Sequence, residues 1–182
     1  MTIQQVPVTG GCLCGAVRYE SKEPPTGGGY CHCRICQRSG GGLFNASVSV
    51  PGPAFRFTKG KPRYYRASSI GKRGFCVECG SPIVFFYEGN PHVWIKIGSL
   101  DHPEDWPMTK EAAWGRSTHA HTDTKIPWYE IRDGLPQSTS GWGEAVAAMN
   151  HVARTVRVTK SGSRRAAAQR LWVPKRSAAA DN

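Results

Sequence analysis

The sequence has no long hydrophobic run, and its first residues show no targeting segment. A membrane-spanning helix needs about 20 consecutive apolar residues, and no stretch of the 182 residues approaches that length. Residues 1–11 contain neither a basic leader nor the apolar core that a signal peptide carries. We therefore expect a cytoplasmic protein that has no membrane partner.

Acidic residues are also scarce. The chain has 24 Lys and Arg against 13 Asp and Glu, which gives a formal net charge of +11. Such an excess favours anionic partners such as nucleic acid or acidic metabolites. The charge is uneven: residues 1–136 carry 16 basic against 11 acidic residues, and residues 137–182 carry 8 against 2. The sequence thus predicts a domain over residues 1–136 and a basic tail over residues 137–182.

The predicted tail is rich in Ala, Arg and Ser. Residues 144–157 have the composition of a short helix, with Val146, Met149, Val152 and Val156 on one face. We expect the tail to be partly helical or disordered. Its basic residues are interpreted as a solvated surface, because isolated basic tails usually are, and nucleic-acid binding is the alternative.

Helical periodicity is rare in residues 1–136. Short segments in which apolar and polar residues alternate, bounded by Gly and Pro, predict β-strands instead. These segments are residues 16–20, 43–50, 55–57, Arg63–Arg66, 72–75, 83–87 and 93–97. Segments 101–106, 118–121 and 126–131 predict loops and one last strand that closes the domain near Pro136. The predicted fold class is mainly β.

Seven cysteines form three clusters. In a reducing cytoplasm, clustered thiols at short spacing favour a metal over disulfides, and an odd count weighs against disulfides as well. The clusters are Cys12 with Cys14, then Cys31, Cys33 and Cys36, then Cys76 with Cys79. Since a tetrahedral site takes four thiolates, one complete site leaves three cysteines over.

The first and third clusters predict a structural zinc site on Cys12, Cys14, Cys76 and Cys79. Such sites usually draw two ligands from each of two chain segments, which the metal then clamps together. A glycine follows each pair and lets the chain turn sharply. The alternative is four free buried thiols. It requires two pairs of cysteines, each at the short spacing typical of a zinc site, to arise by chance.

The middle cluster of Cys31, Cys33 and Cys36 predicts a second zinc site with an open position. Three protein ligands and a vacant fourth are typical of catalytic zinc. Three thiolates give a divalent ion a net charge of −1, which makes a weak Lewis acid suited to a soft ligand such as a substrate sulfur. Because glycine-rich segments lie on both sides, we expect the cluster to lie in a loop.

A histidine that completes a second structural site is the competing interpretation. His32 lies inside the cluster, but its side chain is confined between two ligating neighbours. The remote candidates that folding could bring close are His92, His102, His119 and His121. The sequence leaves the fourth ligand open.

Five segments resemble the glutathione-dependent formaldehyde-activating enzyme family, also called the centromere-protein-V-like family. They are GCLCGAVRY (11–19), CHCRIC (31–36), RGFCVECGS (73–81), GSLD (98–101) and WYEIRDGLP (128–136). The resemblance implies the Mss4-like fold of twisted antiparallel sheets. It also implies two zinc ions, a structural one on the four cysteines and a second one on Cys31, Cys33 and Cys36.

The family's namesake activity implies a carbon–sulfur lyase that joins formaldehyde and glutathione reversibly into S-(hydroxymethyl)glutathione. A related small thiol adduct is an equal expectation for the substrate. Because glutathione is anionic, seven basic side chains are candidates for carboxylate contacts, and an ordinary surface charge is the equal alternative for each. These are Arg34, Arg38, Lys59, Lys61, Arg63, Arg66 and Arg73. The pattern assigns no catalytic role to any residue beyond the cysteines.

Two functions of other classes also fit the sequence. One is a non-enzymatic, zinc-stabilised binding module whose basic tail recruits nucleic acid or a protein. The other is a redox or metal sensor, because a thiolate cluster can release its metal on oxidation.

Overall fold

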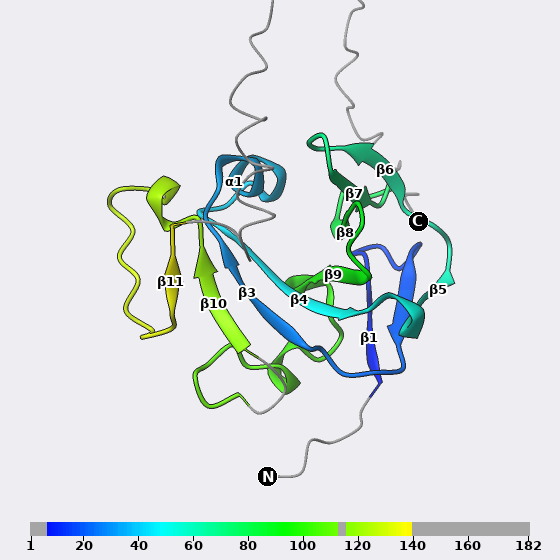
Figure 1. The fold of residues 1–182 in the computed structure, drawn as a ribbon. Helices are drawn as coiled ribbons and strands as arrows, with labels where there is room; N and C mark the ends of the chain where they lie inside the picture. Colours follow the sequence, from blue (N-terminus) through cyan, green and yellow to red (C-terminus); the bar gives the residue numbers. More distant parts are fainter. Residues whose placement is uncertain (1–6, 113–115, 140–182) are drawn as a thin grey trace, which may run out of the picture.

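This computed structural model describes residues 7–112 and 116–139, which hold two β-sheets, one α-helix and four short 3₁₀ helices (Figure 1). The smaller sheet has the strand order β1–β2–β5, formed by β1 (Val8–Gly11), β2 (Arg18–Ser21) and β5 (Phe55–Lys59). The larger sheet has the order β11–β10–β3–β4–β9–β8–β7–β6. Its strands are β3 (Gly27–Cys31), β4 (Asn45–Pro51), β6 (Arg63–Arg66), β7 (Gly71–Phe75), β8 (Pro82–Tyr87), β9 (His92–Lys96), β10 (Arg116–Ala120) and β11 (Gln137–Ser138).

The mainly β architecture with antiparallel sheets is confirmed. Strand β10 is the exception in direction, because it pairs parallel with both β3 and β11. The sequence predicts loops and one last strand over segments 101–106, 118–121 and 126–131 without assigning the strand to one of them, and the structure places strand β10 at Arg116–Ala120. The backbone hydrogen bonds that β3 and β11 offer on either side outweigh the weak strand pattern of this segment.

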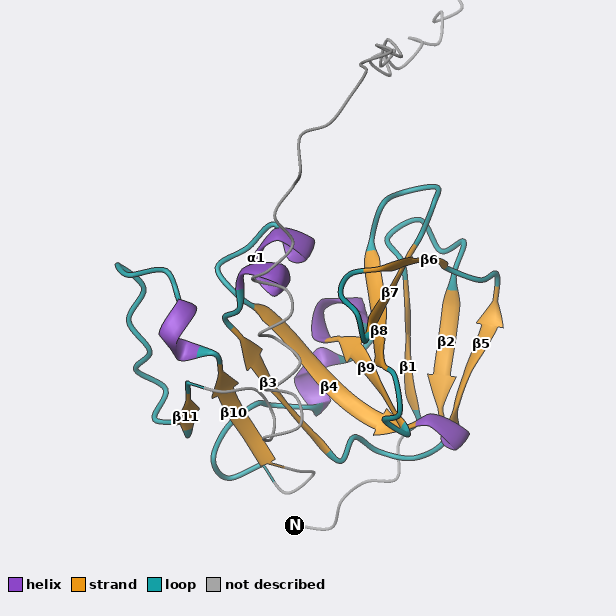
Figure 2. Ribbon diagram, turned by 45° about the horizontal axis from the view of Figure 1, so that its top comes forward, coloured by secondary structure: helices purple, strands orange, loops and turns teal. Residues whose placement is uncertain are grey.

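The hydrophobic core lies between the two sheets. Residues two apart on a strand point to the same face, and Val48, Val50 and Ile95 of the larger sheet pack against Val8 and Tyr19 of the smaller sheet. Tyr19 donates its hydroxyl to the carbonyl oxygen of Ser99 at 2.9 Å, so its one polar atom is paired inside the core. Figure 2 shows the smaller sheet at one side of the molecule and β10 with β11 at the other.

The opposite face of the larger sheet is buried as well, but it carries polar and aromatic side chains. Arg73 lies opposite Phe85 in the register of β7 and β8, and Lys96 lies opposite Ser47 in the register of β9 and β4. Phe85 in turn lies opposite Trp94, two residues before Lys96. Since directly opposed residues share a face, Arg73 and Lys96 both project from this side. We call it the cationic face.

The segment around the middle cysteine cluster is a strand end followed by a helix, so the predicted loop is wrong. The glycines at 27–29 form most of β3, because β10 and β4 hold this strand from both sides. Helix α1 (Arg34–Gly40) starts immediately after Cys33, which is its N-cap. In Figure 1, α1 lies beside the C-terminal end of β3 and the N-terminal end of β4, the two strands that it connects.

The last described segment of the chain follows β10 and returns to pair with it. A short 3₁₀ turn (Thr122–Thr124) and an irregular segment lead to β11, which pairs with β10 beside Pro136. The basic tail beyond residue 139 and its predicted helix lie outside the described residues, so the division at residue 136 stays a prediction. Within residues 7–112 and 116–139, no helix has the length and apolar character needed to cross a membrane.

Candidate functional site

Four cysteines, two from the turn after β1 and two from the turn after β7, lie close together. The sulfur atoms of Cys12, Cys14, Cys76 and Cys79 all lie within 4.8 Å of one another. The distance is 3.5 Å from Cys12 Sγ to Cys14 Sγ and 3.8 Å from Cys14 Sγ to Cys76 Sγ. Zinc–sulfur bonds of about 2.3 Å at tetrahedral angles place sulfur atoms about 3.8 Å apart. The donor set and its spacing therefore fit a tetrahedral metal ion.

Two similar turns hold these four thiols. Gly15 and Gly80 adopt left-handed φ angles of 72° and 76°, which a glycine reaches without steric cost. Each glycine donates its N–H to the carbonyl of the first cysteine of its pair, Gly15 to Cys12 at 3.1 Å and Gly80 to Cys76 at 2.9 Å. The CxCG and CxxCG spacings thus form two knuckles that point sulfur atoms at a common centre.

Among the four thiols of this site, Cys79 is the one whose ionisation its surroundings favour most. Hydrogen bonds from the hydroxyl and the backbone of Ser81 lower the pKa of Cys79 to about 6. A thiolate at neutral pH is the form that binds a metal. The knuckle therefore prepares a ligand as well as placing it.

The second cluster consists of Cys31, Cys33 and Cys36, whose sulfur atoms also lie within 4.8 Å of one another. Cys31 and Cys36 are buried and Cys33 is partly exposed. The cluster is local, since β3 ends at Cys31 and the first turn of α1 carries Cys36. Cys33 Sγ accepts a hydrogen bond from the Cys36 backbone N–H at 3.4 Å. Among the described residues, no histidine or carboxylate joins this group.

The histidines considered as fourth ligands do not join the group of three sulfur atoms, although His121 lies close by. His102 is exposed and bonds Glu104 at 3.2 Å, and His92 begins strand β9. His121, in a left-handed backbone conformation at φ 58°, lines a narrow pocket that Cys33 and Cys36 also line. The arrangement described is therefore one of three thiols beside a pocket.

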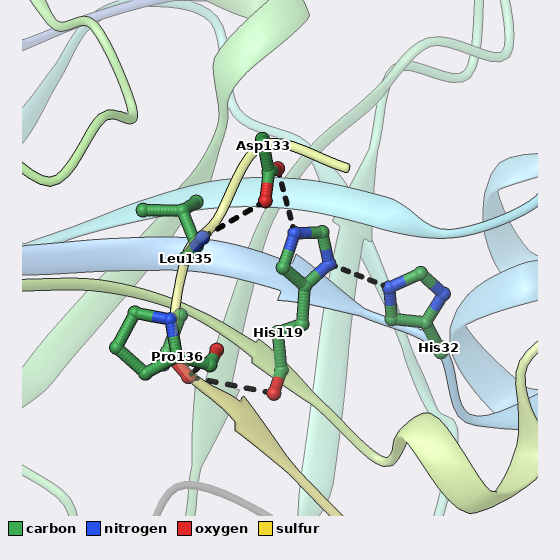
Figure 3. Close-up of polar contacts among 6 residues, drawn as sticks. His32, His119, Asp133, Leu135 and Pro136 are labelled. Atoms are coloured by element: carbon green, nitrogen blue, oxygen red, sulfur yellow. Dashed lines mark hydrogen bonds and ion pairs between the residues drawn. The ribbon is translucent and has the colours of Figure 1, made fainter. Parts of the chain in front are cut away.

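His32 points away from the cluster into a buried hydrogen-bonded row, shown in Figure 3. The Asp133 carboxylate accepts a hydrogen bond from His119 Nε2 at 2.8 Å, which leaves His119 Nδ1 to accept one from His32 Nε2 at 2.8 Å. His32 Nδ1 is then the unprotonated nitrogen, and it is buried without a hydrogen-bond partner. Burial, followed by the nearby His119, lowers the pKa of His32 to about 4. The hydrogen-bonded row of His32, His119 and Asp133 therefore holds the His32 ring in place, and burial keeps this ring neutral.

Of the seven basic residues considered for carboxylate contacts, the structure singles out Arg73. It is 9% exposed, and its Nη2 donates to Cys36 Sγ at 3.4 Å. The other six are exposed to solvent, namely Arg34, Arg38, Lys59, Lys61, Arg63 and Arg66.

Lys96 is a second buried cation on the cationic face. Its Nζ lies 4.8 Å from the centre of the Phe85 ring, and the Arg73 guanidinium lies 5.1 Å from the same ring. Burial, and next the positive charge of Arg73, lower the pKa of Lys96 to about 8. Sequence reasoning missed Lys96, because nothing in the pattern of β9 marks this position as facing the cysteines.

These features define a β-sheet protein with two candidate metal sites, one with four thiols and one with three. The family model of the glutathione-dependent formaldehyde-activating enzyme matches residues 7–116, which is more than half of the chain. The chain belongs to this family.

Comparison with curated proteins finds no match. A solved structure that resembles the chain is the crystal structure of a Rhodobacter sphaeroides protein. The sequence identity is 25% and the TM-score is 0.44, over 51% of this chain and 87% of the other.

Proposed function

We propose that this protein is a cytoplasmic, zinc-dependent carbon–sulfur lyase that acts on S-(hydroxymethyl)glutathione or a related small thiol adduct. The observation that carries the proposal is the cluster of Cys31, Cys33 and Cys36, which offers three thiol ligands beside a pocket in a member of this family. A zinc ion bound there would supply an open position for sulfur and stabilise a thiolate at neutral pH. A second zinc ion on Cys12, Cys14, Cys76 and Cys79 would serve the fold, in a domain that spans residues 1–136.

The reaction is a balanced cleavage without oxidation or reduction. The carbon–sulfur bond of the adduct breaks, and its electron pair stays on sulfur. The hydroxyl oxygen of the adduct forms the carbonyl of formaldehyde, and the hydroxyl proton ends on the thiol. The reverse reaction joins the same two molecules.

The chain's own residues favour charge development at sulfur. Arg73 and Lys96 place positive charge next to the cluster in a buried region, where electrostatic effects on a reacting group are stronger than in water. Phe85 and Tyr87 line the narrow pocket together with Cys33 and Cys36, and they limit the access of water.

The decisive test is magnetisation-transfer NMR on zinc-loaded protein mixed with glutathione and formaldehyde. Faster exchange between free formaldehyde and the adduct, with the Cys33→Ser protein as the inactive control, is the expected result. Equal exchange rates with wild type, Cys33→Ser and no protein would overturn the proposal.

The net charge of +6 on residues 137–182 supports a second candidate function, a zinc-stabilised module that binds nucleic acid. Its test is salt-dependent binding to duplex DNA by the full chain and by a chain that ends at residue 139. Binding that is lost with the tail would support this function, and no binding at low salt would reject it.

A further inference from the structure

The Arg73 guanidinium is buried with part of its hydrogen-bonding capacity unused. Nη2 donates to Cys36 Sγ at 3.4 Å, whereas Nε and Nη1 have no hydrogen-bond partner. An arginine carries five N–H donors in a planar fork, and buried polar groups in folded proteins almost always find partners. Two buried nitrogens of one guanidinium without a partner therefore point to a ligand.

Arg73 lines two pockets, and the larger of them has room for a small ligand. The side chain lines the narrow pocket beside Cys33 and Cys36, and it also lines a pocket of about 350 Å³ between α1 and strands β6 to β8. The larger pocket is lined by Ser39, Tyr65, Arg73, Gly74, Phe75, Gly80, Pro82 and Val84. Arg73 is the residue that these two pockets share.

The protein itself supplies no carboxylate here. Among the described residues, neither Arg73 nor Lys96 forms an ion pair with Asp or Glu. A divalent metal with three thiolates carries a net charge of −1, which balances one of the two cations. Because the sulfur of a hydroxymethyl adduct is neutral, the second cation is left to balance a charge on another part of the substrate. Buried charges without compensation are costly.

We infer that Arg73 is a specificity-determining residue that receives a carboxylate of the thiol substrate beside the three-cysteine cluster. The planar fork matches the two oxygens of a carboxylate. This inference rests on the proposed function, since it requires the cluster of Cys31, Cys33 and Cys36 to bind a metal that takes up sulfur.

The experiment uses cobalt-substituted full-length protein, whose sulfur-to-cobalt absorption reports a thiol that joins the open site. Two probes are titrated, 3-mercaptopropionate and its uncharged amide, 3-mercaptopropionamide. Arg73→Met removes the charge and keeps an apolar stem, and Arg73→Lys keeps the charge. Lys72→Met is the matched control, because Lys72 is the exposed neighbour on the other face of the same strand.

We expect wild type and Lys72→Met to bind the carboxylate probe at least about tenfold more tightly than the amide, as one charge pair in a partly buried site predicts. Arg73→Met should lose most of this preference, since only the charge of Lys96 remains, and Arg73→Lys should keep it. Two bound metal ions per chain in each variant show that it has folded.

The two failures look different. Equal affinity of wild type for both probes, or an unchanged preference in Arg73→Met, would overturn the role of Arg73 and leave the metal site intact. If neither probe changes the cobalt spectrum of wild type, or if only one metal binds per chain, the proposed function itself fails.

Discussion

His32 and His119 share a hydrogen bond of 2.8 Å between Nε2 and Nδ1, and this contact ties the middle of the second cysteine cluster to strand β10. The two rings also stack, with their centroids 5.1 Å apart. Asp133 holds His119 from the other side. The segment that carries Cys31 and Cys33 is therefore positioned by residues about 90 places further along the chain.

The first prediction concerns His119. Replacement by Gln removes the stacking with Tyr30, whose ring lies 4.7 Å away, and disrupts two buried hydrogen bonds. We expect a loss of about 1–3 kcal/mol in the free energy of unfolding, measured by urea denaturation. His102→Gln, at an exposed histidine, is the control and should change stability little. Equal stability of the two variants would contradict the structural role of the row.

The sequence could predict much of the fold, because strands such as β8 and β9 are continuous runs of β-branched and aromatic residues. It could also group the cysteines, since their spacing is local information. It could not predict β3, and it could not tell which late segment becomes strand β10, because Gly27–Gly29 and residues 116–120 become strands only through pairing with neighbours distant in sequence. The same limit applies to the site: Arg73 and Asp133 lie in recognisable segments, but the contacts with Cys36 and His119 depend on tertiary folding.

The four-cysteine cluster is expected to support the whole fold. It joins the turn after β1 to the turn after β7, so we predict that Cys79→Ser costs about 3 kcal/mol or more, because metal-binding energy contributes directly to folding at structural sites. Thermal unfolding of the metal-loaded protein measures this effect. A chelator should lower the melting temperature of wild type in the same direction.

The three-cysteine cluster should behave differently. Serine is a good N-cap, so Cys33→Ser keeps the side-chain acceptor that starts α1 and removes only the thiol. We predict that this variant binds one metal ion fewer, loses activity and melts within a few degrees of wild type. If Cys33→Ser and Cys79→Ser lose similar stability, the division into a structural and a reactive site is wrong.

The knuckle glycine Gly80 can be compared with Gly98, a glycine outside the knuckles. A methyl group added at Gly80 or at Gly98 meets no atom within 4 Å, but Gly80 alone of the two has a positive φ, of 76°. Gly80→Ala should therefore cost about 1–2 kcal/mol through backbone strain, and Gly98→Ala should be neutral or slightly stabilising. Urea denaturation of both variants tests this, and a neutral Gly80→Ala would show that the knuckle tolerates another backbone shape.

The last prediction concerns stability in alkali. Burial raises the pKa of Tyr19 above its ordinary value of 10.0, so the folded state keeps the phenol neutral while the unfolded state ionises it. The contribution of Tyr19 is fully present below about pH 10, and it falls by up to about 1.4 kcal/mol per pH unit as the pH rises towards the folded pKa. Tyr19→Phe loses the hydrogen bonds to Ser99 and should be less stable by about 1 kcal/mol at pH 7. Denaturation from pH 7 to 11 should show the gap between wild type and Tyr19→Phe closing above pH 10, because only wild type carries the group that ionises on unfolding. Parallel profiles over this range would contradict the prediction, because they would mean that the phenol ionises equally in both states.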